Sequence, residues 1–209
     1  LLALALLIAT PLGVGTALYL TEYTRGGWGT KIIRLGTEVL AGVPSIIFGL
    51  FGYALFVLRL GLGWSLLSGA LTLSCMVLPT IIRTAEEALR AVPQAYREVS
   101  LSLGAGRWQT VARTVLPSAM PGILTGVALA AGRSLGETAA VIFTAGTALR
   151  LPLSPLDPTR TLSVHFYLLA REGISLERAY ATAVVLVVSV LVVNLAASWA
   201  LNRLIARRT

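Results

Sequence analysis

Five long apolar stretches constrain what this chain can fold into. They lie at residues 1–20, 37–58, 64–82, 117–147 and 179–201. A helix needs roughly 20 apolar residues to cross a hydrocarbon core about 30 Å thick, and these stretches have that length. They are too long for strands and do not alternate between apolar and polar residues. The sequence therefore predicts an all-α, polytopic membrane helical bundle with five visible spans.

The composition supports lipid as the solvent for much of this surface. Of the 209 residues, 56% are hydrophobic and only 12% are charged, and the mean hydropathy is +0.82. A soluble domain carries about 25% charged residues. The net charge of +8 is also typical of nucleic-acid binding, but the basic residues are spread along the chain and form no single patch. The single cysteine, Cys75, has no partner for an internal disulfide and is a small apolar filler.

The basic residues also orient the spans. Three follow the first stretch, five follow the third and three follow the last, whereas five lie in the remaining connections. Because cytoplasmic loops carry the excess of Lys and Arg, the richer side is cytoplasmic, with Leu1 outside and the C-terminus inside. The first stretch begins without a Met, a flanking charge or a signal-peptide pattern. We therefore expect a sixth span before residue 1, which makes the chain an N-terminally truncated membrane domain.

Two opposite charges interrupt the fourth stretch. Arg133 and Glu137 lie four residues apart in "AGRSLGETAAVIFTAG". If the helix enters the membrane near Pro121, they lie about 18 Å and 24 Å deeper. An isolated charge at the centre of a membrane helix costs roughly 2.5–3.5 kcal/mol. The i,i+4 spacing places both side chains on one face, where they can neutralise each other.

Two interpretations of this pair remain open. It can lock helix packing, or it can line the path of an anion, since ionisable residues inside spans often mark such routes. The guanidinium fork of Arg133 matches phosphate oxygens, and Glu137 would hold that fork in place. Thr138 can line the same path. The sequence favours the anion path.

Residues 83–116 are predicted to form a cytoplasmic loop with its own helices. Pro93 opens the first helix, which ends near Gly104, a residue suited to a left-handed cap. Gly106 then separates it from a second helix, "RWQTVARTVL", that leads to Pro117. Such a helical pair is either a solvated cap or a docking surface for a partner protein, and the second interpretation is favoured.

The loop carries a recognisable signature. "EVSLSLG", nine residues and "TVLP" resemble the EAA signature of ABC importer permeases, which reads Glu-Ala-Ala, three residues, Gly, nine residues, Ile, one residue, Leu-Pro. The residues that match in register are Glu98, Gly104, Leu116 and Pro117. The residues that depart from it are Val99, Ser100 and Thr114. The resemblance implies a coupling helix, with Glu98 and Gly104 shaping the loop and with Arg97 and Arg107 pairing with acids on an ATPase.

Other segments extend the resemblance over essentially all 209 residues. "EVLAGVPSIIFGLFGYALFV", "LPTIIRTAEEALRAVP" and "GRSLGETAAVIFTAG" are similar to the phosphate-specific permease family, more to its PstA branch than to PstC. This implies one transmembrane domain over residues 1–209 of a bacterial inner-membrane phosphate importer. The implied partners are a PstC-like permease, two PstB-like subunits that bind ATP and Mg, and an external PstS-like phosphate-binding protein.

The sequence contains no ATP-binding motif of its own. A P-loop needs Gly-Lys-Ser/Thr, but the only lysine, Lys31, lies between Thr30 and Ile32. The chain is therefore interpreted as a transport subunit and not as an enzyme, with ATP chemistry on a partner. Alternatives are a PstC-type paralogue, a sulfate or molybdate permease, and a passive anion channel, which would need no EAA loop. An intramembrane enzyme acting on a lipid phosphate would need a nucleophile or metal ligands, which His165 and Cys75 do not supply convincingly.

Overall fold

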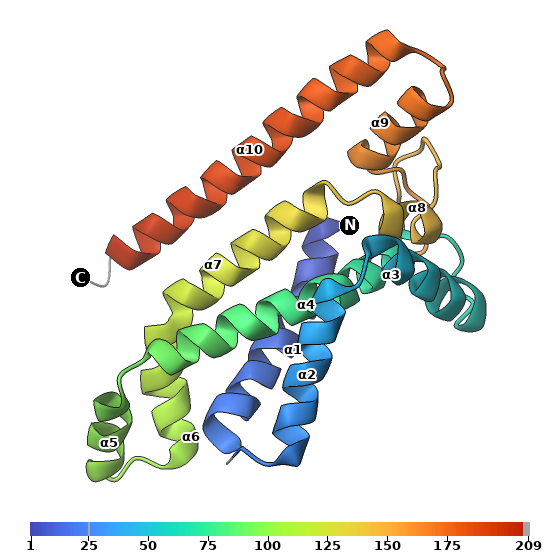
Figure 1. The fold of residues 1–209 in the computed structure, drawn as a ribbon. Helices are drawn as coiled ribbons and strands as arrows, with labels where there is room; N and C mark the ends of the chain where they lie inside the picture. Colours follow the sequence, from blue (N-terminus) through green and yellow to red (C-terminus); the bar gives the residue numbers. More distant parts are fainter. Residues whose placement is uncertain (25, 207–209) are drawn as a thin grey trace.

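The computed structural model describes residues 1–24 and 26–206, and every regular element within them is a helix (Figure 1). The α-helices are α1 Leu2–Leu18, α2 Trp28–Gly42, α3 Ser45–Gly52, α4 Leu66–Ala91, α5 Gln94–Ser102, α6 Arg107–Thr110, α7 Leu116–Leu135, α8 Ala139–Thr144, α9 Leu162–Arg171 and α10 Leu176–Ala206. Three π-helical segments extend or join them, namely η1 Tyr19–Tyr23, η2 Tyr53–Arg59 and η3 Val111–Val115. The predicted all-α fold class is confirmed.

Helix α4 is the centre of the bundle. It packs against α1, α2, α3, α7 and α8. In the most apolar 18-residue segment of α4, 61% of the residues are buried, whereas none is buried in the corresponding segment of α10. Helix α10 contacts mainly α7 and α9. Two apolar clusters surround α4, one built on Leu73, Met76 and Val77, the other on Ala85 and Leu89. The other helices are therefore positioned by how they meet α4.

Glycines let two helices approach α4 closely. At Gly126 of α7, an added Cβ atom would lie 1.9 Å from the Oγ1 atom of Thr84. At Gly52 of α3, it would lie 2.1 Å from the Oγ1 atom of Thr72. Such small residues allow membrane helices to pack backbone against backbone. The hydroxyl of Thr84 donates to the carbonyl of Thr80 at 2.9 Å, so its polarity is satisfied within α4.

Four helices are long and apolar enough to cross a membrane, over Leu2–Tyr23, Leu66–Ala91, Arg107–Leu135 and Leu176–Trp199. They correspond to the stretches predicted at residues 1–20, 64–82, 117–147 and 179–201. The predicted boundaries of two of them are wrong. The third helix continues to Ala91 and the fourth starts at Arg107, so much of the predicted loop 83–116 belongs to these helices. The fourth also ends at Leu135 and not at residue 147.

The second stretch, predicted as one span over residues 37–58, is broken. Helices α2 and α3–η2 meet at an angle of 104°, which Figure 1 shows as a sharp turn. Pro44 lacks a backbone donor and disfavours the helical conformation of the residue before it, and Val43 is indeed extended, with φ −71° and ψ 131°. Pro11 and Pro79, by contrast, lie inside continuous helices. The break sends α3 sideways toward α8.

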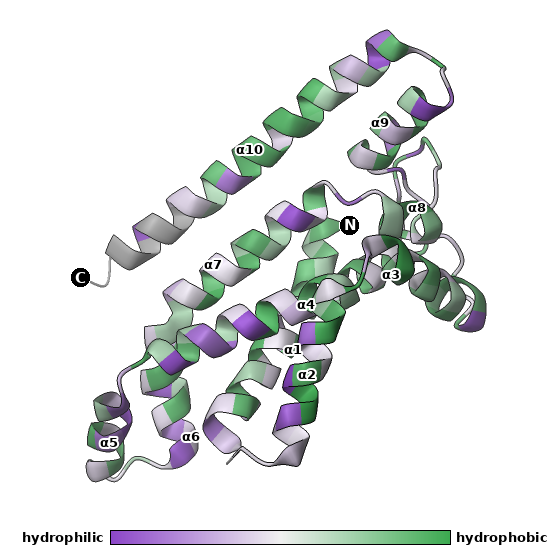
Figure 2. Cartoon of the chain, in the orientation of Figure 1, coloured by the Kyte–Doolittle hydropathy of each residue, from purple (hydrophilic) through white to green (hydrophobic). Residues whose placement is uncertain are grey.

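The bundle has two different ends. Figure 2 shows hydrophilic residues gathered on α5, α6 and the adjoining parts of α2 and α4, whereas α3 and α8 are mainly hydrophobic.

At the α3–α8 end, the connection over residues 145–161 anchors the start of α4. The carbonyl of Asp157 accepts a hydrogen bond from the Leu66 amide at 2.8 Å. Backbone donors of Ser154 and Leu153 lower the pKa of the Asp157 carboxyl.

Candidate functional site

The charged pair of the fourth stretch lies where the helix breaks. Helix α7 ends at Leu135, and α8 begins only at Ala139. Gly136 caps α7, and the Glu137 amide donates to the Ser134 carbonyl at 3.3 Å. Both predictions for this pair assumed a continuous helix. Because Glu137 lies beyond the end of α7, the predicted common helix face and the predicted depth of about 24 Å for Glu137 are wrong.

Glu137 stabilises this break. Its Oε1 atom accepts a hydrogen bond from the Ala140 amide at 3.2 Å, in the first turn of α8. Its backbone carbonyl accepts from the Ser163 hydroxyl of α9 at 2.8 Å. Ser163 is buried. Glu137 therefore connects the end of α7, the start of α8 and the start of α9.

Arg133 has no such partner. It is exposed, and it forms no hydrogen bond or ion pair with any residue that the structure describes. The predicted mutual neutralisation of Arg133 and Glu137 is therefore not formed. A cation in the last turn of a helix is favoured by the helix dipole, which stabilises Arg133 where it stands. Its guanidinium keeps five N–H donors for an anion or for a partner chain.

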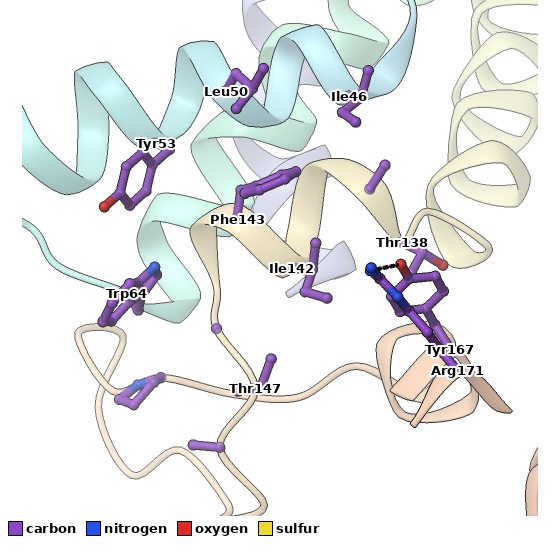
Figure 3. Close-up of a pocket in the computed structure, with 14 residues that line it drawn as sticks. Ile46, Leu50, Tyr53, Trp64, Thr138, Ile142, Phe143, Thr147, Tyr167 and Arg171 are labelled. Carbon is purple, nitrogen blue, oxygen red and sulfur yellow. Dashed lines mark hydrogen bonds between the residues drawn. The ribbon is translucent and has the colours of Figure 1, made fainter. Parts of the chain in front are cut away.

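A cavity of about 970 Å³ lies beside this break, between α3, α8 and α9 (Figure 3). Its lining is mostly apolar and aromatic and includes Ile46, Leu50, Tyr53, Trp64, Ile142 and Phe143. Thr138 lines it too, on the same side as Tyr167 and Arg171 in Figure 3. The Arg171 guanidinium donates to the Tyr167 hydroxyl and lies 5.6 Å from the centre of that ring.

Tyr167 and Arg171 were not singled out from the sequence. The sequence does carry a local signal, because these two residues lie four positions apart in "TLSVHFYLLAREG", the segment that folds as α9. The cavity could not be anticipated, since residues from α3, η2, α8 and α9 line it together. Among the described residues, no cluster of His, Cys, Asp or Glu is placed to hold a metal ion.

The opposite end of the bundle carries the predicted loop. Helix α5 begins after Pro93, and Gly104 adopts the left-handed conformation with φ +82°. The Gly106 amide donates to the side chain of Gln109 at 3.0 Å, which caps α6. The hydroxyls of Ser100 and Thr110 lie 2.9 Å apart and tie α5 to α6. The predicted pair of helices around Gly104 is confirmed.

Arg97 faces into the chain. Its guanidinium forms an ion pair with Glu22 at 2.7 Å, and the two side chains are only 15% and 11% exposed. It also donates to the carbonyls of Val92 at 2.8 Å and Leu89 at 3.0 Å. Arg97 is thus occupied within the chain in this conformation, and its pairing with an acid of an ATPase stays a prediction. Glu22, 75 residues away in the sequence, carries no local signal of this role.

The remaining residues of the predicted signature lie around this pair. Arg107 is exposed, donates to the Glu22 carbonyl and lies 5.2 Å from the centre of the Tyr23 ring. Glu98 is exposed, and its carbonyl accepts from the Ser102 hydroxyl at 2.8 Å. Leu116 packs against the buried cluster around Leu89. Pro117 follows the wider π-helical turn η3, as expected where a proline removes an α-helical donor.

Large apolar side chains project from the same end. Leu103 is 83% exposed and Trp108 is 67% exposed. With the other exposed side chains of α5 they form what we call the coupling surface, defined by Tyr96, Val99, Leu101, Leu103 and Trp108. Large exposed apolar side chains gathered within one short segment mark contact sites for other proteins or for membranes.

Comparison with known proteins identifies the family. Residues 9–209 match the family model described as binding-protein-dependent transport system inner membrane component. The probable ABC transporter permease protein YqgI of Bacillus subtilis is 42% identical over 95% of this chain and 73% of its own length. The phosphate transport system permease protein PstA 1 of Mycobacterium tuberculosis is 38% identical over 98% of this chain and 67% of its own.

The fold has a counterpart among solved structures. A chain of the MetNI methionine ABC transporter, solved in inward-facing conformations, superposes with a TM-score of 0.77. The match covers 97% of this chain and 92% of that one at 19% sequence identity, so it establishes the fold alone. Together with the family match, these likenesses show that the chain belongs to the inner-membrane permease subunits of binding-protein-dependent ABC importers.

Proposed function

We propose that this chain forms part of the translocation path of an ATP-driven phosphate importer, with Arg133 as an anion-binding residue. The observation that carries the proposal is the Arg133 guanidinium at the end of an apolar helix, which pairs with none of the residues that the structure describes. A planar guanidinium fork matches the oxygens of phosphate. The relative named PstA 1, a phosphate permease, supports phosphate as the anion.

Glu137 and Thr138 complete this site in the proposal. Glu137 holds the break between α7 and α8 through Ala140 and Ser163, which fixes the helix end that carries Arg133. Thr138 follows directly and lines the cavity beside α9. Glu137 is thus a positioning residue that acts through the backbone and not through a direct ion pair with Arg133.

The coupling surface is proposed to seat on a separate ATPase subunit. Two such subunits would bind ATP and Mg, and a second permease and an external phosphate-binding protein would complete the importer. ATP-driven movement of α5 would switch the path between outward-facing and inward-facing states, with the C-terminus in the cytoplasm. A ligand shifts such an equilibrium only through different affinities for the two states.

Phosphate uptake by the reconstituted importer tests the role of Arg133. Arg133→Gln should lower uptake on the order of tenfold or more, because it removes a charge-assisted hydrogen bond. Arg133→Lys should retain part of the uptake. The matched control is Arg150→Gln. Arg150 is an exposed arginine in the connection over residues 145–161, and its guanidinium lies 3.8 Å from the Asp157 carboxylate. Normal uptake by Arg133→Gln would refute the role.

Competition identifies the anion in the same assay. An excess of sulfate or molybdate should leave labelled phosphate uptake unchanged if phosphate is the substrate. Strong inhibition by either anion would instead assign the chain to a permease for that oxyanion.

The coupling surface is tested separately by its attachment to the ATPase. Leu103→Asp places a charge on the most exposed apolar residue of that surface, so less ATPase subunit should co-purify with the chain. Leu153→Asp is the matched control, since Leu153 is 96% exposed in the connection at the other end of the bundle. Equal recovery of the ATPase from both variants would place the contact elsewhere.

A further inference from the structure

A second cavity, distinct from the one beside α8, lies at the coupling end of the bundle. It measures about 880 Å³ and is enclosed by η1, α2, the end of α4, α5 and α6. Its lining includes the four arginines Arg34, Arg90, Arg97 and Arg107. Among the described residues, Glu22 is the only acidic member of that lining. We call it the arginine cavity.

Most donors of these arginines are unused among the described residues. Arg97 is the exception, since Glu22 and two backbone carbonyls occupy it. Arg34 and Arg90 each use one nitrogen on the same Oε1 atom of Glu86, at 2.7 Å and 2.6 Å. The Nε atom of Arg34 is buried and has no hydrogen-bond partner in the described part of the chain. Each guanidinium carries five N–H groups, so the cavity presents many free donors.

The charges around the cavity are unbalanced. Four arginines and one carboxylate line the cavity itself, and the adjoining hollow, which Arg34 and Arg90 also line, adds Arg83, Glu38, Glu86 and Glu87, so that five arginines face four carboxylates. The side chains of Glu22 and Glu86 are only 11% exposed, so water screens this cluster incompletely. Clefts lined by one sign of charge raise the local concentration of counter-ions. The terminal nitrogen atoms of Arg34 and Arg90 that do not contact Glu86 remain available to a bound anion, because these side chains are 36% and 56% exposed.

We propose that the arginine cavity binds a phosphate group, with Arg34, Arg90 and Arg107 as its ligands. The group is either cytoplasmic inorganic phosphate or the headgroup of an anionic phospholipid. Arg107 and Arg133 lie at opposite ends of one helix, roughly 40 Å apart at the α-helical rise. The proposed site is therefore separate from the translocation path and does not depend on which anion the importer carries. A ligand there would bridge α2, α4 and α6, and it would hold α5 in this conformation because the hydroxyls of Ser100 and Thr110 tie α5 to α6.

Inorganic phosphate is the first probe. The full chain with its permease and ATPase partners, without the external binding protein, is placed in phosphatidylcholine nanodiscs, and its thermal unfolding midpoint is measured against phosphate concentration. Every complex in this experiment also carries Arg133→Gln, so that phosphate binding at Arg133 does not contribute to the measured midpoint. Arg34→Gln should weaken the apparent phosphate affinity on the order of tenfold, since a charge-assisted bond is lost. Arg113→Gln, an exposed arginine of η3 outside the cavity lining, should leave it unchanged.

Bound lipid is the second probe. The same complexes purified from membranes that contain phosphatidylglycerol are analysed by native mass spectrometry. Loss of retained phosphatidylglycerol in Arg34→Gln, but not in Arg113→Gln, identifies the headgroup as the occupant. Arg90→Gln, with its side chain 56% exposed, gives a second variant if Arg34→Gln fails to assemble. The proposal is overturned if the parent shows neither phosphate-dependent stabilisation nor retained lipid, or if cavity and control variants behave alike.

Discussion

Arg97 shows how one residue can hold three elements together. It belongs to α5, it binds Glu22 of η1, and it donates to two carbonyls at the C-terminal end of α4. The last carbonyls of a helix lack partners within the helix, so a cation is favoured there. Displacement of α5 must therefore move α1 and α4 with it or break this pair.

Removal of Glu22 should destabilise this junction. Glu22→Gln removes the negative charge that compensates the nearly buried Arg97 guanidinium, at a cost of about 2–3 kcal/mol, which is below the range for a fully buried pair. The thermal unfolding midpoint of the purified complex should fall. Glu38→Gln, an exposed acidic residue of α2, is the matched control and should leave the midpoint unchanged. Equal midpoints for the two variants would show that the pair does not brace α5.

Long-range partners explain why the residue-level predictions were only partly right. The EAA-type spacing correctly marked Gly104 as a left-handed helix end, because a local rule governs that position. The pairing of Arg133 with Glu137 also followed a local rule, but the rule requires a continuous helix, and α7 ends between them. Glu22 and Arg97 meet only through tertiary packing, which no spacing in the sequence encodes.

The helices themselves were largely predictable because the bilayer sets their length. Hydropathy located four spans, yet it did not locate their ends, because α4 and the helix from Arg107 extend into polar sequence. Proline alone did not decide where a helix breaks. Pro79 is buried inside α4 and Pro11 is exposed inside α1, yet both helices continue, whereas Pro44 follows an extended residue between α2 and α3. Neither the presence of a proline nor its exposure therefore decides the break.

The contact between α4 and α7 depends on a glycine. In Gly126→Ala the new methyl group would lie 2.6 Å from the Cβ atom of Thr84, which cannot rotate away. Overpacking of this kind costs about 1–3 kcal/mol. The midpoint of thermal unfolding of the complex should therefore fall. Gly15→Ala in α1 is the control, since nothing lies within 4 Å of its added Cβ atom, and it should be neutral or slightly stabilising. A similar midpoint for both variants would mean that α7 shifts freely against α4.

At the scale of the whole molecule, the proposed functions lie at two opposite ends. One end holds the arginine cavity and the coupling surface. The other end holds the break at Glu137 and the mostly apolar cavity between α3, α8 and α9. Helix α7 connects the two ends directly, and α4 supports it along the way. Movement at the proposed ATPase contact would therefore reach the proposed anion site through continuous, packed helices.

This division requires a fixed orientation in the membrane. The excess of basic residues predicts that the coupling end and the C-terminus are cytoplasmic. The connection over residues 145–161 should then lie outside the cell. With Cys75 replaced by alanine, Leu153→Cys in this connection should react with a membrane-impermeant maleimide in intact spheroplasts. Arg203→Cys near the end of α10 should react only after permeabilisation, and both positions are exposed enough to be labelled. The opposite labelling pattern would show that the chain has the inverted orientation. The coupling surface would then lie outside the cell, where a cytoplasmic ATPase could not contact it or act on Arg133.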